Sequence, residues 1–396
     1  METEAKYCTA TKGVASWLLV LALAGSGCHG SSDLAAARQS RTVTAGGRQF
    51  QVFVAPPPPG EEQPCAWYGA ARDNLLYFGE AAFWNALRRT DQPTADLAET
   101  GAQRIGRFRL APVPGMLPPI PIARDRPSGV WDVFPHSQGR LYFTTFFESA
   151  GYVDPETGEV RRFTALGTGL NEWAAGPGDS LLVSRYAADS GERGGSVLWI
   201  DPEGNLLAEM PLHAAREGSK IAPKTVAWDP MRNQIWVTTD VIPQRAGPDG
   251  HPTLVLDMAG RERLRVSEFE IQFVRFGPDG TGYLALAEDS SLFLAILEPG
   301  PAESDPGQAR RILLDPHFAR DYDFTQDLEL AADGRVIVTT WSGGIHVVDP
   351  REDGTVDSLA FPRLDPDGLY YTAVLAGNSL CATYCSDLAV VCTDLE

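Results

Sequence analysis

A repeated unit constrains the fold of this chain more than any other feature of its sequence. Each unit has four strand-like stretches, and the third ends in an Asp-Pro turn. The second stretches begin at a Gly, Asp or Asn turn and are rich in Leu, Val, Tyr, Trp and Thr: DNLLYFGE from Asp73, GRLYFTTF from Gly139, DSLLVSRY from Asp179, NQIWVTTD from Asn233, GTGYLALA from Gly280, GRVIVTTW from Gly334 and NSLCATYC from Asn378. One sheet of four strands cannot bury both of its faces, so such units must stack and close into a ring.

The repeat predicts an all-β chain folded as a single β-propeller of seven four-stranded blades. Six blades are the alternative count, because the first unit is irregular, and a pair of β-sandwiches also suits evenly spaced short strands. Sandwiches do not require the recurring closures YVDPETGEV, WIDPEGNLL and VVDPREDGTV, so we favour the propeller. The expected blades cover residues 65–112, 128–165, 169–213, 221–267, 268–316, 322–362 and 367–395.

The last unit is one strand short. A strand-like segment near the N-terminus, Arg48–Val54 (RQFQVFV), has no unit of its own. We therefore expect this strand to complete the final blade and close the ring. Residues 88–101 lack strand character and are expected to form an excursion, and the proline-rich stretch 112–121 is expected to be a stiff connection.

The N-terminus carries an export signal. Lys6 and Lys12 precede the apolar run VASWLLVLALA, which ends at Ala24 and is followed by small residues up to Cys28. This order of a positive start, a short apolar stretch and small residues is that of a secretory signal peptide. The run is shorter than the about 20 residues that a membrane-spanning helix needs.

Cys28 resembles the lipidated cysteine of bacterial lipoproteins. The resemblance implies a signal peptide over residues 1–27, a flexible tether over 28–42 and a propeller domain over 43–396. Cleaved export without lipid and an uncleaved anchor are the alternatives. His29 stands where an Asp often retains a lipoprotein in the inner membrane, so the resemblance favours the outer membrane and a cell-envelope, extracytoplasmic location.

Four cysteines remain in the propeller, and an even number fits an oxidising compartment. If Ser386-Asp387 forms a two-residue hairpin turn, Cys381 and Cys392 lie directly opposite each other, within disulfide reach. That pairing leaves Cys65 for Cys385, which would link the start of the domain to its end. Three connectivities are possible, and a zinc site is the competing interpretation.

The charge excludes one class of partner. Asp and Glu number 52 and Lys and Arg 33, which gives a formal net charge of −19. Such a surface repels phosphate backbones and anionic lipid headgroups, so we expect no nucleic-acid binding and membrane contact only through the lipid anchor.

Candidate site residues lie on the innermost strands, where propellers usually bind ligands. The chain has no H-E-x-x-H, G-x-S-x-G or Walker A motif. The polar residues expected to line the channel are Asp132, Asn171, Glu172, Lys224, Gln272, Gln326, Asp327 and Tyr371. Carboxylates and amides around a funnel could hold Ca²⁺ or Mg²⁺, although channel mouths are also polar simply because they are wet.

One blade carries a family resemblance. The segment Thr325–Pro350 is similar to a blade of the gluconolactonase/regucalcin-like family, and the Asp-Pro closures resemble those of virginiamycin B lyase-like propellers. The resemblance implies that Asp327 binds the catalytic metal and that Asn171, with Glu172 beside it, completes the ligand set. The glycines that follow both residues in the family are missing here.

Two functions follow from these observations. The first is a lipid-anchored extracytoplasmic propeller that acts as a scaffold for a protein or small-molecule ligand. The second is a metal-dependent lactonase or lyase using Asn171, Glu172 and Asp327. We favour the binding protein over the enzyme, because the chain lacks a complete catalytic set. The sequence identifies neither ligand nor substrate.

Overall fold

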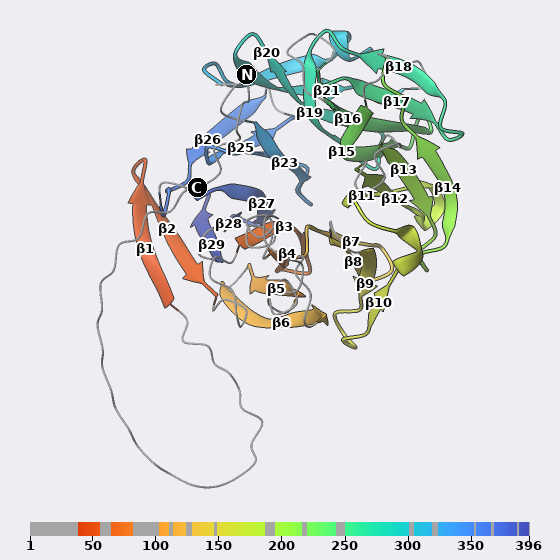
Figure 1. Ribbon diagram of the computed structural model, residues 1–396. Coiled ribbons are helices and arrows are strands. Elements are labelled where there is room, and N and C mark those ends of the chain that lie inside the picture. The colour runs from red at the N-terminus through yellow and green to blue at the C-terminus, as the bar shows by residue number, and fades with distance from the viewer. Residues whose placement is uncertain are drawn as a thin grey trace, which may run out of the picture.

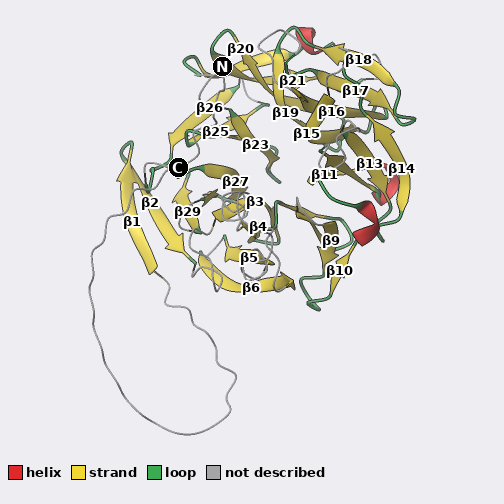
Figure 2. Ribbon diagram, in the orientation of Figure 1, coloured by secondary structure: helices red, strands yellow, loops and turns green. Residues whose placement is uncertain are grey.

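The computed structural model is a ring of seven β-sheets arranged around a central axis (Figure 1). It describes residues 39–55, 65–81, 103–110, 114–123, 129–145, 149–186, 195–215, 220–242, 250–300, 305–318, 324–351, 354–365, 368–385 and 388–395. Among these residues there is no α-helix; the helical segments are the short 3-10 turns η2 (Thr164–Leu166), η3 (Pro177–Asp179) and η4 (Pro306–Gln308) (Figure 2). Cys28, the predicted signal peptide and the expected excursion 88–101 lie outside the described residues.

Six blades have four antiparallel strands in chain order, with the first strand nearest the axis (Figure 1). Blade 1 contains β3 (Cys65–Arg72), β4 (Leu75–Ala81), β5 (Gln103–Arg109) and β6 (Gly115–Ala123). Blade 2 contains β7 (Asp132–Pro135), β8 (Leu141–Thr145), β9 (Ser149–Val153) and β10 (Val160–Arg162). Blade 3 contains β11 (Leu170–Ala175), β12 (Leu181–Arg185), β13 (Ser196–Ile200) and β14 (Leu206–Pro211).

The second half of the ring repeats this arrangement. Blade 4 contains β15 (Lys220–Asp229), β16 (Gln234–Ile242), β17 (Thr253–Asp257) and β18 (Glu262–Val266). Blade 5 contains β19 (Glu270–Phe276), β20 (Gly282–Glu288), β21 (Ser291–Leu297) and β22 (Arg310–Asp315). Blade 6 contains β23 (Thr325–Leu330), β24 (Val336–Thr340), β25 (Gly344–Asp349) and β26 (Thr355–Ala360). The prediction of a seven-bladed propeller is confirmed.

Blade 7 is built from both ends of the chain. Its strands β27 (Tyr370–Ala376), β28 (Ser379–Tyr384) and β29 (Ala389–Asp394) are followed by β2 (Arg48–Val54), which pairs antiparallel with β29. The predicted closure by an N-terminal strand is therefore confirmed. A fifth strand, β1 (Gln39–Ala45), pairs with the outer edge of β2.

Two sequence-based boundaries change. Strand β1 begins at Gln39, so the last four residues of the predicted tether, 39–42, belong to a sheet. The expected stiff connection 112–121 was wrong in its second half, because β6 is the outermost strand of blade 1 and contains three of those prolines. An outermost strand tolerates proline, since only one of its edges must donate hydrogen bonds to a neighbour.

The hydrophobic core is divided among the seven contacts between neighbouring blades. One cluster joins Leu76, Phe78 and Phe108 of blade 1 to Val374 and Val390 of blade 7. The remaining interfaces are filled in the same way by clusters that each draw on two adjacent blades. The second strands are buried on both faces, as in the BBBBB pattern of β8 and β24, because each is covered by a blade on either side. Each fully buried Leu, Val or Phe contributes about 1.5–3 kcal/mol.

The repeated Asp-Pro closures are turns in which the Asp side chain accepts backbone N–H groups. Asp154 Oδ1 accepts from the N–H groups of Glu156 at 2.9 Å and Thr157 at 3.0 Å. Asp201 and Asp349 Oδ1 accept from backbone N–H groups of their own turns in the same way. A glycine with φ of +75° (Gly158) or +86° (Gly204) completes the first two reversals. This chemistry explains why the closures recur almost unchanged in the sequence.

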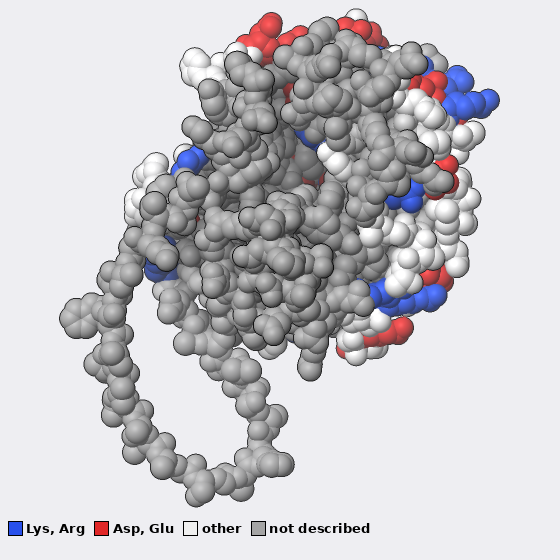
Figure 3. All heavy atoms as spheres, in the orientation of Figure 1, with Lys and Arg blue, Asp and Glu red and all other residues white. Residues whose placement is uncertain are grey.

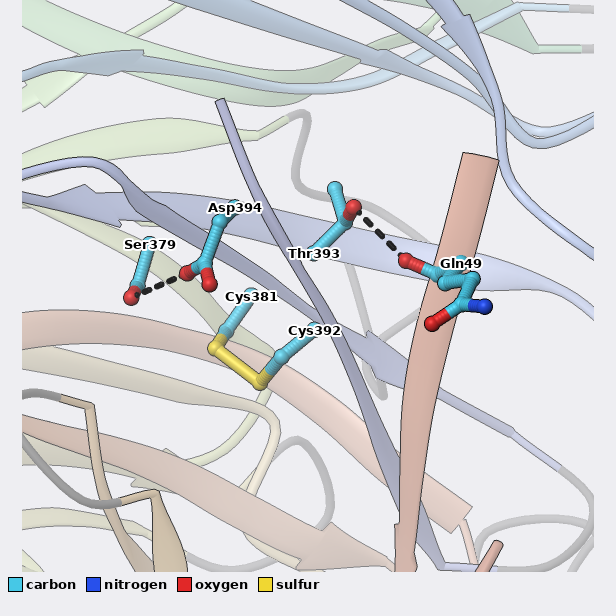
Figure 4. Close-up of a disulfide and its surroundings, with 6 residues drawn as sticks. All are labelled: Gln49, Ser379, Cys381, Cys392, Thr393 and Asp394. Atoms are coloured by element: carbon cyan, nitrogen blue, oxygen red, sulfur yellow. Dashed lines mark hydrogen bonds between the residues drawn. A yellow bond between two sulfur atoms is a disulfide. The ribbon is translucent and has the colours of Figure 1, made fainter. Parts of the chain in front are cut away.

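Two disulfides hold the closing seam, in the connectivity predicted from the sequence. Cys381 on β28 pairs with Cys392 on β29, and the two residues are directly opposite in the strand register. Figure 4 shows this bond beside the hydrogen bond from Thr393 Oγ1 to the Gln49 carbonyl oxygen, 2.9 Å, which ties β29 to β2. The second disulfide, between Cys65 and Cys385, joins β3 of blade 1 to blade 7. Structural disulfides persist in oxidising compartments, which indicates an extracytoplasmic location.

Among the described residues, no helix is both long and apolar enough to cross a membrane.

The two disulfides should differ in their contribution to stability. The Cys65–Cys385 bond spans 320 residues and the Cys381–Cys392 bond spans 11. Because a crosslink that closes a longer loop restricts the unfolded chain more, C65A/C385A should lower the free energy of unfolding by about 3 kcal/mol more than C381A/C392A. Urea unfolding of the two double variants measures this difference. Equal losses would mean that loop closure does not dominate.

Candidate functional site

The channel along the ring axis contains two cavities, of about 600 and 170 Å³. The larger cavity opens between the turns that follow the innermost strands, near Asp73 and Asp333. The smaller one lies at the opposite mouth, where the innermost strands begin. Tyr68, Asp132 and Glu172 line both cavities, so the two meet at the level of these side chains. Basic and acidic atoms are visible in the depression near the centre of the ring (Figure 3).

A bulge near the start of the innermost strand recurs in six blades. The register shifts occur in β3, β11, β15, β19, β23 and β27. In three of these blades an N–H group at the bulge donates to a hydroxyl of the second strand: Glu172 N to Ser184 Oγ at 3.1 Å, Thr225 N to Thr238 Oγ1 at 3.2 Å, and Thr372 N to Thr383 Oγ1 at 3.2 Å. Bulges redirect side chains. Here the register brings one side chain per blade to a common level: Tyr68, Asp132, Glu172, Thr225, Phe273, Asp327 and Thr372.

The side chain of an arginine contacts the carboxylates of this level. Arg275 on β19 contacts Glu172 Oε1 through Nη2 at 2.5 Å and lies 3.9 Å from Asp327 Oδ1. Asp327 also accepts a hydrogen bond from Thr372 Oγ1 and one from the N–H group of Leu328. Asp132 accepts from two backbone N–H groups, those of Val133 at 2.8 Å and Trp173 at 2.9 Å. The carboxylates are thus held in fixed orientations by strands from different blades.

Burial dominates the acid–base properties of this group. It raises the pKa of Asp132 and of Asp327 to about 6 and that of Glu172 to about 8, although Arg275 acts in the opposite direction on each. Burial and the charge of Asp327 raise the pKa of Glu329 well above its usual range. For Arg275 burial lowers the pKa, but the surrounding carboxylates raise it more strongly, so the guanidinium stays charged. The channel therefore retains protons on some of its carboxyl groups at neutral pH.

Aromatic side chains form an arc beside the smaller cavity. Phe324 stacks on Trp341 with ring centroids 4.8 Å apart, and Trp341 contacts Tyr371 at 6.1 Å. Tyr371 contacts Trp67 at 5.4 Å, and Trp67 contacts Trp131 at 4.3 Å. We call Phe324, Trp341, Tyr371, Trp67 and Trp131 the aromatic arc. Phe324 is 41% exposed and, with Trp131, lines the smaller cavity.

The buried polar atoms at this mouth that have no partner among the described residues include one on Gln326 and one on Glu172. Gln326 is 2% exposed; its Oε1 accepts a hydrogen bond from the Tyr68 hydroxyl at 2.6 Å, whereas its Nε2 is buried without an acceptor. Glu172 Oε2 is buried without a donor, although Oε1 contacts Arg275. Buried polar atoms usually have partners, so these two mark positions where a ligand atom or water would fit.

The structure places the predicted channel residues on the innermost strands, all near the entry mouth. Asp132, Lys224, Gln272 and Gln326 line the smaller cavity, and Tyr371 belongs to the aromatic arc. Gln272 Oε1 accepts a hydrogen bond from the N–H group of Thr325 at 2.6 Å, which links blades 5 and 6.

The three predicted metal ligands do not form an ion site. Asn171 Nδ2 donates to the Lys224 carbonyl oxygen at 2.9 Å, and Glu172 and Asp327 both face Arg275. In the part of the chain that the structure describes, no three His, Cys, Asp or Glu side chains are placed to share a metal. The residues present do not fit the Ca²⁺ or Mg²⁺ that the family resemblance implies.

Arg275, Glu329 and most of the aromatic arc were missed by the sequence analysis. The predicted residues lie at the common level or just before it, whereas Arg275 and Glu329 lie two positions beyond it. The charge of Arg275 between the apolar residues Val274 and Phe276 was the available signal for it.

No family model and no curated protein sequence matches this chain. Solved structures do match it. A catalytically inactive virginiamycin B lyase from Staphylococcus aureus with quinupristin aligns with 88% of this chain and 100% of its own, at 11% identity and a TM-score of 0.56. The WD40 domain of Neurospora crassa Pan2 (84% and 92% covered, TM-score 0.53) and the WD40 β-propeller of Doa1 (87% and 96%, TM-score 0.54) are also 11% identical. At this identity the likeness shows the propeller fold.

Protons held in the channel should make stability depend on pH. Because burial raises the pKa of Glu172 above its value in the unfolded chain, the folded state binds this proton more tightly. That stabilisation is complete below the unfolded pKa and is lost as the pH rises through about 8. In the wild type, the free energy of unfolding should therefore fall by on the order of 4 kcal/mol between about pH 5 and 8 because of Glu172, and Glu172→Gln should remove this part of the fall. Urea unfolding at several pH values measures this. An unchanged slope would show that Glu172 does not hold the proton.

Proposed function

We propose that this protein is a lipid-anchored, extracytoplasmic binding propeller that takes a ligand at the entry mouth of its channel. The aromatic arc carries this proposal: five ring side chains from blades 1, 2, 6 and 7 gather beside a cavity of about 170 Å³. Ligand sites are typically concave, largely apolar and equipped with a few oriented polar groups. The buried Nε2 of Gln326 and Oε2 of Glu172 supply such groups here.

Binding is better supported than catalysis. The metal-dependent lactonase or lyase requires a ligand set, and Glu172 and Asp327 are instead engaged by Arg275 and Thr372. Structural likeness to a lyase at 11% identity does not carry its chemistry to this chain. We therefore propose binding as the function of this protein, and not catalysis.

The anchor is tested directly at Cys28. In a bacterial host fed an alkyne fatty acid, the wild-type chain should become labelled and sediment with membranes. Cys28→Ala should abolish both properties, whereas Cys8→Ala, which removes another cysteine before the propeller, should change neither. Labelling that survives Cys28→Ala would overturn the assignment of the anchor.

The mouth is tested with Phe324→Ala. Phe324 is 41% exposed, so its truncation should change the free energy of unfolding by only about 0.5 kcal/mol. Loss of a ring that a ligand packs against should weaken binding about tenfold. The measurement is a thermal-shift screen of amino acids, amines, sugars and small aromatic compounds, followed by calorimetry of the compounds that stabilise the protein.

Leu313→Ala is the matched control. Leu313 is 48% exposed on β22, an outermost strand, and its truncation should leave binding unchanged. Compounds that bind both variants as well as the wild type would place their site elsewhere. If no compound stabilised the protein, the result would contradict the proposed function.

A further inference from the structure

We infer that the ligand of this mouth is an organic cation, a protonated amine joined to a single ring or an apolar group of similar size. This inference rests on the proposed function and names its ligand class. It combines four observations: the aromatic arc, the size of the cavity beside it, the excess of carboxylates behind it, and the two buried atoms that lack a partner.

The apolar part of the ligand follows from the arc and the cavity. Rings recognise flat apolar groups by stacking and edge contacts, and they also attract cations through their faces. The stacked pair Phe324 and Trp341 and the exposed edge of Phe324 offer such a surface. A cavity of about 150 Å³ holds one benzene ring. The 170 Å³ measured here therefore admits one ring with a short substituent.

The cationic part of the ligand follows from the ionisable side chains that line the smaller cavity and the larger cavity behind it. Asp132 and Glu172, from blades 2 and 3, line the smaller cavity, and Asp327 and Glu329, both on β23, line the larger cavity. The guanidinium of Arg275 contacts Glu172 and lies 3.9 Å from Asp327. Lys224 on β15 adds one positive charge at the rim, and the Tyr68 hydroxyl adds a neutral group. The four carboxyl groups outnumber these two basic groups, and burial keeps some of the carboxyl groups protonated at neutral pH. A cation bound beside them favours their ionised form, and walls of low dielectric strengthen that attraction.

The two buried atoms without a partner indicate which polar groups the ligand carries. Glu172 Oε2 lies at the junction of the two cavities, and once the carboxyl group has released its proton this oxygen accepts hydrogen bonds only, which an ammonium N–H would satisfy. Gln326 Nε2 donates only, because the Tyr68 hydroxyl already occupies Oε1 of the same amide. A ligand that carries both an amine and a hydroxyl or carbonyl oxygen would offer each of these atoms a partner of the right kind. A carboxylate ligand would instead meet the carboxyl groups that line the two cavities.

The first experiment compares three probes that share a phenyl ring. Calorimetry at pH 7.5 would use phenethylamine, 2-phenylethanol and phenylacetate, which are cationic, neutral and anionic. We expect phenethylamine to bind at least tenfold more tightly than the alcohol, and phenylacetate to show no binding. Equal affinities for amine and alcohol would overturn the cation while leaving the aromatic mouth, and with it the proposed function, in place.

Substitution of Glu172 locates the charge that is recognised. Glu172→Gln keeps the size of the side chain and should reduce the preference for amine over alcohol to about threefold or less. Glu156→Gln, an exposed change of the same charge on the turn after β9, should leave the preference intact. A preference that falls equally in both variants would trace the selectivity to the overall charge of −19 and would overturn the site.

A measurement on the wild-type protein keeps the inference testable if Glu172→Gln does not fold. An ammonium beside Glu172 favours the ionised carboxyl, so binding should release a proton. The heat of phenethylamine binding at pH 7.5 should then differ between phosphate and Tris buffers, whose ionisation enthalpies differ. Affinity should also rise from pH 6.5 to 8.5, where an alkylamine stays protonated. Binding without proton release would overturn the contact with Glu172.

Discussion

Each blade of this protein is a sheet with two apolar faces, and the burial of both faces is the constraint on which the rest of the structure depends. A face left open at either end of the series would expose residues such as Leu76 and Phe78 of blade 1. Closure is provided by β2, which completes blade 7, and by the Cys65–Cys385 bond between blade 7 and blade 1. The ring is therefore closed where β2 pairs with β29 and blade 7 meets blade 1.

Ring closure also creates the channel and fixes what faces it. Seven innermost strands surround the axis, and each must expose some side chains toward it. The bulges in six of them bring one residue per blade to a common level. In blades 3, 4 and 7 a Ser or Thr hydroxyl of the second strand accepts a hydrogen bond from an N–H group at the bulge. The Thr that recurs in stretches such as IWVTTD and LCATYC thus supports the channel, although Thr238 and Thr383 do not line either cavity.

The channel then gathers groups that would be costly to bury alone. Glu172, Asp327 and Arg275 come from blades 3, 6 and 5. Arg275 reduces the cost of burying the two carboxylates, and the carboxylates reduce the cost of burying Arg275. Burial is the main reason that some of the carboxyl groups keep their protons near neutral pH. A bound cation would favour the release of these protons, which connects the acid–base properties of the channel to the proposed ligand.

Much of the fold could be predicted from the sequence because its signals are local. The Asp-Pro closures indicate turns, because the hydrogen bonds of these turns form within a few residues of Asp154 or Asp201. The Cys381–Cys392 pair could be predicted from the register of one hairpin. The proline-rich β6 was misjudged because tolerance of proline depends on the strand's position at the outer edge of the sheet, which no local pattern reports.

The candidate site shows the same limit more clearly. The sequence alone determined the ring, the number of blades, the strand that closes it and the polar residues on its innermost strands. Only the tertiary structure decided that Arg275 lies between Glu172 and Asp327, and that Phe324, Trp341, Tyr371, Trp67 and Trp131 form one surface. The alternation of apolar and polar residues in strands, and the hydrogen bonds within turns, depend on residues a few positions apart, so they can be recognised in the sequence. Contacts across the channel join residues more than 50 positions apart, and their partners are set by the curvature and closure of the whole ring.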